Sequence, residues 1–190
     1  MKDISMYVAA GLFTAGERFH NAQVEKNLVE CAKKRDINLI TSFPQRNALS
    51  EFGTDGLVNI AKIVSNCEWD AALNEYILCN LDGTDADSGT ADELGIARGQ
   101  QIAYDRMKQQ HPELELDLQI PKIITYRTDF RTVDEKDGGD GIDRSVNAML
   151  RPEGSRHVYH PCFNIELSEA NGFYKELASK IIDVVKSDIK

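Results

Sequence analysis

The stretch that decides the fold begins Tyr76-Ile-Leu-Cys-Asn-Leu-Asp82 and resumes as Asp85-Ala-Asp-Ser-Gly-Thr-Ala-Asp-Glu-Leu-Gly95. Its first half is a short apolar run, which is typical of a buried strand. Its second half is an acidic turn that leads into a helix-forming segment. We expect the strand to end at Asp82 and the helix to be capped by Ser88 or Thr90, because short hydroxyl side chains satisfy the first backbone N–H groups of a helix.

Glu93 is the first candidate site residue, because this arrangement puts it in the first turn of the helix, at the open end of the sheet. Open α/β sheets bind ligands at that edge. A helix N-terminus favours an ionised carboxylate by about 0.3–1 kcal/mol, so Glu93 is suited to act as an anionic nucleophile. The position also fits an ordinary helix start, where Asp and Glu are common.

Outward from this stretch, strand-like and helix-like segments alternate along the chain. Strands are expected at residues 4–10, 38–42, 76–81 and 122–126, with a short one around 159–165, and helices at 17–34, 55–73, 90–110 and 169–186. This alternation predicts a parallel sheet with right-handed crossovers. A chain of 190 residues with 42% hydrophobic content can form one core. We therefore predict a single α/β domain over residues 1–190, a flavodoxin-like three-layer α/β/α sandwich with a central parallel sheet.

Composition narrows the classes of partner and location. The net charge of −9 repels phosphate backbones, which argues against nucleic acid polymers as partners. No segment reaches the roughly 18 apolar residues of a membrane span, and the first residues lack the basic start of a signal peptide. We therefore expect no membrane association and a cytoplasmic location.

The cysteines and histidines give no reason to expect a metal or another cofactor. Cys31, Cys67, Cys79 and Cys162 lie far apart and include no CxxC pair, so buried thiols are the default expectation. The four histidines lack the spacing of metal ligands.

Four segments follow one another along the chain: Tyr7-Val-Ala-Ala-Gly-Leu-Phe13, the block from Leu81 to Ala97, Ile124-Thr-Tyr-Arg-Thr-Asp-Phe-Arg131, and Asn147-Ala-Met-Leu150. In content and order they resemble the nucleoside 2-deoxyribosyltransferases, which move 2-deoxyribose from one nucleobase to another. The resemblance covers roughly residues 4–150. It implies a metal-free enzyme that acts on small nucleosides and nucleobases.

On the sugar side, the resemblance assigns Glu93 as the nucleophile that forms a covalent glycosyl-enzyme, the route of retaining transfer at an anomeric carbon. It implies that Tyr7 hydrogen-bonds and orients Glu93, that Asp87 contacts the 5-hydroxyl of the sugar, and that Gly89 also belongs to the substrate site. A carboxylate at position 87 would repel a 5-phosphate, which favours nucleosides over nucleotides. Without the resemblance, Tyr7 fits a core tyrosine at a strand end, and Asp87 fits a helix cap.

On the base side, the resemblance implies that an Asp or Asn on the helix before the third strand gives a proton to the departing base, and Asn66 and Asp70 are the candidates. These residues share a helix face by i, i+4 geometry, and Asp70 is our choice. Phe13 is a candidate to cover the face of the base. Gln45 is a candidate to read its edge, because an amide offers both a donor and an acceptor. Phe13 and Gln45 fit structural roles equally well.

The resemblance also implies a homo-oligomer with shared active sites, in which Asn147 and Met149 complete the site of a neighbouring subunit. The alternation of Val146, Ala148 and Leu150 can anchor this segment on its own core. The other interpretation is that Asn147 caps a short helix and Met149 fills a core gap.

The function expected from these residues is nucleoside 2-deoxyribosyl transfer through a covalent deoxyribosyl-glutamate intermediate. If water replaces the second base, the same residues give a nucleoside or nucleotide N-glycohydrolase. A further alternative is a non-catalytic flavodoxin-like module that binds nucleosides.

Overall fold

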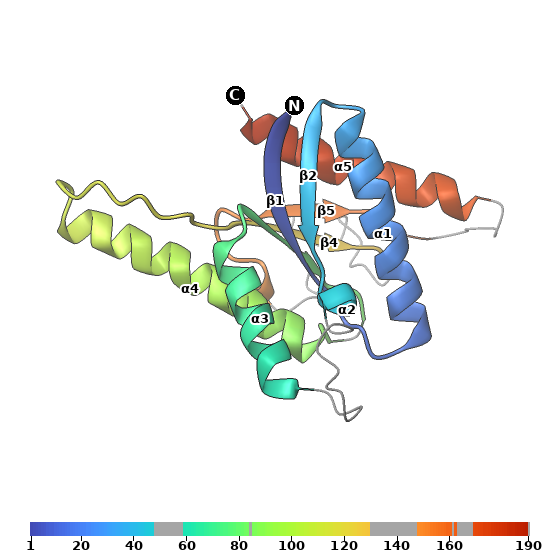
Figure 1. Cartoon of the computed structure of the whole chain (residues 1–190), viewed down its shortest axis with the longest axis horizontal. Coiled ribbons are helices and arrows are strands. Elements are labelled where there is room, and N and C mark those ends of the chain that lie inside the picture. Colours follow the sequence, from blue (N-terminus) through green and yellow to red (C-terminus); the bar gives the residue numbers. More distant parts are fainter. Residues whose placement is uncertain (48–58, 84, 130–147, 161, 163–168, 190) are drawn as a thin grey trace, which may run out of the picture.

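The computed structural model describes residues 1–47, 59–83, 85–129, 148–160, 162 and 169–189 (Figure 1). Five strands form one parallel sheet: β1 (Lys2–Ala9), β2 (Ile37–Ser42), β3 (Tyr76–Asn80), β4 (Lys122–Arg127) and β5 (Arg156–Tyr159). Their spatial order is β2-β1-β3-β4-β5, which is the flavodoxin-like order with its reversal between β1 and β3. The predicted fold class is confirmed.

Five α-helices and a short 3₁₀ turn accompany the strands within the described residues. They are α1 (Ala15–Lys33), α2 (Pro44–Asn47), α3 (Ile60–Leu73), α4 (Ser88–Gln110) and α5 (Ala170–Asp188), with the turn η3 at Ala148–Leu150. None of these helices is long and apolar enough to span a bilayer.

The two faces of the sheet carry separate cores. Figure 1 shows α1 and α5 on one side of the sheet and α3 and α4 on the other. Because side chains alternate along a strand, Ile4, Met6 and Val8 of β1 join the core under α1 and α5, whereas Tyr7 and Ala9 join the core under α3 and α4. Tyr7 thus reaches the helical layer that carries Glu93.

Most element ends differ from the expected ones by one or two residues, and two differ more. The last strand is Arg156–Tyr159, where it pairs with β4 from Ile124 to Arg127, and residues 161 and 163–165 of the expected strand lie outside the described part of the chain. Helix α3 begins at Ile60, where Asn59 accepts a hydrogen bond from the backbone of Lys62, and residues 55–58 of the expected helix lie outside the described part of the chain.

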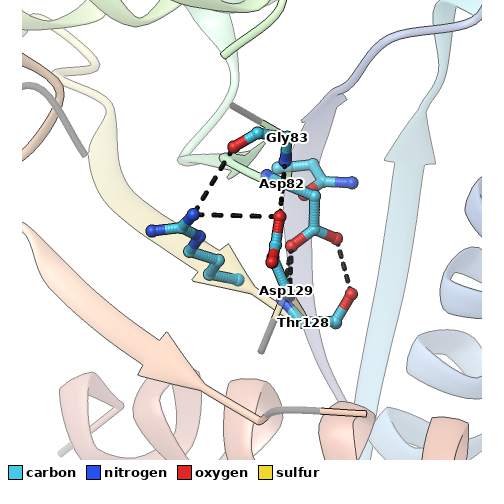
Figure 2. Close-up of polar contacts among 6 residues, drawn as sticks. Asp82, Gly83, Thr128 and Asp129 are labelled. Atoms are coloured by element: carbon cyan, nitrogen blue, oxygen red, sulfur yellow. Dashed lines mark hydrogen bonds and ion pairs between the residues drawn. The ribbon is translucent and has the colours of Figure 1, made fainter. Parts of the chain in front are cut away.

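A set of polar contacts at the carboxyl ends of β3 and β4, which we name the Asp82 clasp, comprises Asp82, Gly83, Arg127, Thr128 and Asp129 (Figure 2). Arg127 donates to the carbonyl of Gly83 at 3.4 Å and lies 3.9 Å from the carboxylate of Asp129. The Asp82 carboxylate accepts three hydrogen bonds. Two come from Thr128, from its backbone N–H at 2.5 Å and from its side-chain hydroxyl at 2.5 Å, and the third comes from the backbone N–H of Asp129 at 2.8 Å. In return, Asp129 accepts from the backbone N–H of Gly83 at 3.3 Å. Gly83 has φ 108°, a conformation that favours glycine. The clasp therefore fixes the start of the loop that leads from β3 to α4.

Candidate functional site

Helix α4 begins with a cap that differs from the expected one. Its N-cap is Asp87, whose Oδ2 accepts hydrogen bonds from the backbone N–H of Thr90 at 2.9 Å and from the Thr90 hydroxyl at 3.2 Å. The expectation that Ser88 or Thr90 caps the helix is therefore wrong. Ser88 is the first helical residue, so Glu93 lies in the second turn and not in the first. The alternative interpretation of Asp87 as a cap is correct, and the two cap bonds use only one of its carboxylate oxygens.

Tyr7 and Glu93 meet between the sheet and α4. The Tyr7 hydroxyl donates to Glu93 Oε1 at 2.5 Å, although the two residues are 86 positions apart. The Tyr7 side chain has no exposed surface, and Glu93 is partly buried. Burial and the neighbouring carboxylate raise the pKa of Tyr7 far above its usual value, so the phenol remains a donor at neutral pH.

The acidity of Glu93 is set by burial rather than by the helix terminus. Burial raises the pKa of Glu93 to about 7, and the negative charges of Asp87 and Asp92 act in the same direction. The hydrogen bond from Tyr7 opposes this rise in the pKa, and so does the Cys67 side chain. The expected preference for the ionised form fails for two reasons: the helix dipole weakens beyond the first turn, and loss of hydration disfavours a charge. Near neutral pH the carboxyl group is thus poised between its two protonation states.

Cys67 is a site residue that sequence reasoning missed. It is partly buried on α3 and packs against the core that contains Tyr7 and Leu94, and the charge of Glu93 contributes to the raised pKa of its thiol, after burial. The signal that could have identified it is its position three residues before Asp70, because residues at i and i+3 share a helix face.

The base-side candidate Asp70 lies in the same layer. Its Oδ2 accepts a short hydrogen bond from the hydroxyl of Ser42, the last residue of β2, and Ser42 is paired in register with Tyr7. The charge of Asp70 also contributes to the raised pKa of Cys67, which follows mainly from burial. Asn66 is partly buried one turn before Asp70 on α3.

The two candidates for base recognition, Phe13 and Gln45, make no hydrogen bond to Glu93 within the described part of the chain. Phe13 is 83% exposed, just after the carboxyl end of β1. Gln45 donates through Nε2 to the carbonyl of Arg18 at 3.3 Å, and its Oε1 is buried without a hydrogen-bond partner in the described part of the chain.

Glycines allow close approach around Asp87. A Cβ on Gly89 would lie 3.2 Å from Asp87 Oδ2. A Cβ on Gly11 would lie 2.9 Å from Glu17 Oε1 and 3.6 Å from the Asp87 Cβ. The loop after β1 and the start of α4 are therefore in contact, which brings the segment following Tyr7 against the cap carboxylate.

The segment expected to reach a neighbouring subunit is only partly described. Asn147 lies outside the described residues. Met149 is 83% exposed, whereas the adjacent Leu150 packs against the core under α3 and α4. Among the described residues, no group of three or more His, Cys, Asp or Glu side chains is arranged to hold a metal ion.

Comparison with known proteins identifies the fold rather than the activity. No protein-family model matches the sequence, and no curated protein matches it. Among solved structures, a conserved protein from Enterococcus faecalis V583 is similar with a TM-score of 0.56 at 15% identity, covering 91% of this chain and 98% of that one. A 2-desoxiribosyltransferase from Leishmania mexicana is similar with a TM-score of 0.50 at 18% identity, covering 91% of this chain and 97% of that one. At such identities the likeness establishes a shared flavodoxin-like fold, whose members perform many chemistries.

Proposed function

We propose that this chain is a nucleoside 2-deoxyribosyltransferase, which exchanges the nucleobase of 2-deoxyribonucleosides through a covalent deoxyribosyl-glutamate intermediate. The observation that carries the proposal is the 2.5 Å hydrogen bond from Tyr7 to Glu93, a carboxylate held in a partly buried position beside Asp87. The likeness to the Leishmania mexicana transferase provides the fold-level analogy.

In the proposed reaction, Glu93 attacks the anomeric carbon of the deoxyribose. The bond from that carbon to the base nitrogen breaks, and an ester bond to the glutamate oxygen forms. Asp70 supplies the proton to the leaving base, with the Ser42 hydroxyl fixing its orientation. A second base then attacks the same carbon through a ring nitrogen, the ester bond to Glu93 breaks and releases the carboxylate, and Asp70 takes up the proton that the incoming base loses.

The charge around the nucleophile bears on the substrate class. The negative charges of Asp87 and Asp92 both raise the pKa of Glu93, so both charges are felt at the Glu93 carboxylate. A 5-phosphate would add a further negative charge there, so we propose that uncharged nucleosides react in preference to their monophosphates. Asp87 is the proposed partner of the 5-hydroxyl, because both of its cap bonds use Oδ2.

We also propose that the site is shared between subunits of a homo-oligomer. Leu150 packs on its own subunit's core, the one that contains Tyr7, and the neighbouring Met149 is 83% exposed. An outward-facing side chain next to an anchored one is the geometry needed to contribute to another subunit's pocket. The experiment is to refold Glu93→Gln and Asn147→Ala chains together. Recovery of activity in verified mixed oligomers supports sharing, and a fully active monomer contradicts it.

The central test is incubation of the protein with deoxyinosine or thymidine plus adenine, followed by separation of the products. We expect deoxyadenosine together with the released base. The control is the same reaction without adenine. Free deoxyribose as the main product with acceptor present would instead assign an N-glycohydrolase. No change in the substrate would contradict both activities. Asp92→Asn is the matched control for a Glu93→Gln variant, because Asp92 is the adjacent, exposed carboxylate on α4.

A further inference from the structure

We propose that His157 is a positioning residue: its ring accepts a hydrogen bond from Thr125, donates one to Ser155, and so fixes the turn that follows Met149. The role of this turn in catalysis rests on the shared site proposed above. The hydrogen bonds themselves can be tested without any substrate.

Three short contacts join β4 to the turn that precedes β5. Thr125 Oγ1 lies 2.5 Å from His157 Nδ1, and Ser155 Oγ lies 2.9 Å from His157 Nε2. The Ser155 hydroxyl also lies 2.5 Å from the carbonyl oxygen of Pro152. Thr125 is buried and is the register partner of His157 between β4 and β5, so the series of contacts begins at a fixed point of the sheet.

The protons available in this series assign a direction to each bond. The Pro152 carbonyl can only accept, so the single hydroxyl proton of Ser155 is used there. The contact between Ser155 and His157 therefore needs a proton on Nε2. Partial burial and the charge of Arg151 lower the pKa of His157 to about 4, so the ring is neutral near pH 7 and has no second proton. Nδ1 is then an acceptor, and the Thr125 hydroxyl donates to it.

A serine hydrogen-bonded to a histidine is also the arrangement of an activated nucleophile. In that arrangement the serine donates its proton to the ring. Here the ring donates to Ser155, because the serine proton is directed to Pro152. The pair therefore holds the backbone in place rather than activating the serine.

The backbone that it holds is a four-residue turn from Pro152 to Ser155. The backbone N–H of Ser155 donates to the Pro152 carbonyl at 3.1 Å, beside the bond from the Ser155 hydroxyl. Gly154 has φ 81°, which suits the glycine position of such a turn. Both bonds that close the turn thus come from the residue that His157 fixes.

Two anchors therefore hold the stretch that follows the exposed Met149. One is Leu150, which packs on the core under α3 and α4, and the other is Ser155. Thr125 lies on the same face of the sheet as this core, because Ile123, two residues earlier on β4, belongs to it. Loss of the Ser155 anchor should loosen this stretch and leave the direction of the Met149 side chain less well defined.

The first measurement is nitrogen NMR on histidine-labelled protein, with the His157 signals assigned by their loss in His157→Gln. We expect a neutral ring with its proton on Nε2 near pH 7. Thr125→Val removes the donor to Nδ1, so the Nδ1 signal should shift in this variant. A proton on Nδ1, or an Nδ1 signal that is the same in wild type and Thr125→Val, would overturn the inference.

The second measurement is hydrogen exchange of residues 148–155 by mass spectrometry. A glutamine at position 157 places an amide N–H near the position of Nε2 and can still donate to Ser155, whereas asparagine is too short to reach it. We expect exchange about fivefold faster in His157→Asn, the effect of one lost hydrogen bond, and close to wild type in His157→Gln. His111→Asn, at the exposed end of α4, is the matched control and should leave the segment unchanged.

Equal exchange in wild type and His157→Asn would contradict the positioning role, and so would equal increases in the asparagine and glutamine variants, because they would indicate a packing effect. If His157→Asn does not fold, Ser155→Ala removes the same link and should give the same increase.

In the transfer assay, we expect His157→Asn to raise KM several-fold with kcat nearly unchanged, since Met149 is proposed to bind substrate and not to react. His157→Gln should restore KM. An unchanged KM in an active His157→Asn enzyme would show that the turn does not serve the site. If the NMR and exchange results are as expected but wild-type protein transfers no deoxyribose, the hydrogen bonds stand and the proposed function fails.

Discussion

The Asp82 clasp and the Tyr7–Glu93 pair are two carboxylate sites built from the same strand-to-helix connection, and they differ in how well each carboxylate is satisfied. Asp82 receives three hydrogen bonds, two of them from backbone N–H groups that cannot move away. Glu93 accepts a hydrogen bond from the phenol of Tyr7, and burial raises its pKa to about 7. The difference teaches that burial and the number of hydrogen-bond donors together decide how a carboxylate is stabilised: Asp82 is held by three donors, whereas burial raises the pKa of Glu93.

The two carboxylates also act on different layers. Asp82 exerts its charge on the residues under α1 and α5, where it raises the pKa of the buried Tyr126 and opposes the lowering of the His20 pKa by burial. Glu93 acts on Tyr7, Cys67 and Cys79 under α3 and α4. Variants at each site should therefore separate effects on stability from effects on chemistry.

The largest expected effect is on catalysis. Glu93→Gln should lower the transfer rate by about 10³-fold or more, because no uncharged amide can form the glycosyl-enzyme. Circular dichroism should show an unchanged fold, and Asp92→Asn should keep most of the activity. A folded Glu93→Gln protein that retains more than about a hundredth of the wild-type rate would show that Glu93 is not the nucleophile.

The next largest effect is on stability at the clasp. Asp82→Ala leaves two backbone N–H groups and the Thr128 hydroxyl without their acceptor, so we expect the free energy of unfolding to fall by roughly 2–3 kcal/mol. Urea denaturation measures this change. Asp85→Ala, at an exposed position of the same loop, is the control and should change it by less than about 0.5 kcal/mol. Equal losses from the two variants would mean that the clasp does not stabilise the fold.

A third prediction concerns the pH dependence of stability. The pKa of Glu93 is about 7 in the folded protein, above its usual value of 4.5. Between these two pH values the folded protein therefore keeps a proton on Glu93 that the unfolded chain has lost. The Glu93 contribution to stability should therefore be greatest below pH 4.5 and fall as the pH rises through 7. Glu93→Gln cannot ionise, and its free energy of unfolding should exceed that of wild type by on the order of 2 kcal/mol above this window. A constant difference at every pH would contradict the shifted pKa.

The smallest effect is expected from one clasp donor. Thr128→Val removes the hydroxyl that donates to Asp82 and keeps the backbone N–H, so the free energy of unfolding should fall by about 1 kcal/mol. Combined with Asp82→Ala it should cost little more, because both variants remove the same hydrogen bond. Full additivity in urea denaturation would show that the two side chains do not interact in solution.

Most of the fold could be predicted from local patterns. Apolar runs such as residues 76–81, and the helical segments that separate one such run from the next, can be recognised from neighbouring residues alone. Their alternation predicts a parallel sheet. The helix ends are predicted less accurately than the helices themselves. Asp87 caps α4 because its carboxylate reaches the backbone of Thr90, and several adjacent polar residues could have served equally well by composition.

For the candidate site, the sequence by itself determined that a carboxylate follows β3 at the carboxyl edge of the sheet, because strand, turn and helix start are contiguous. Only the tertiary structure decided how that carboxylate is surrounded. Tyr7 comes from β1, and its hydrogen bond to Glu93, which the family resemblance implied, is present. Cys67 of α3 packs against the same core as Tyr7, and no local pattern specifies contacts between residues so far apart in the chain. The raised pKa of Glu93 is also a property of the assembled layers, since desolvation depends on the packing of α3 and α4 around the carboxyl group and not on its neighbours in sequence.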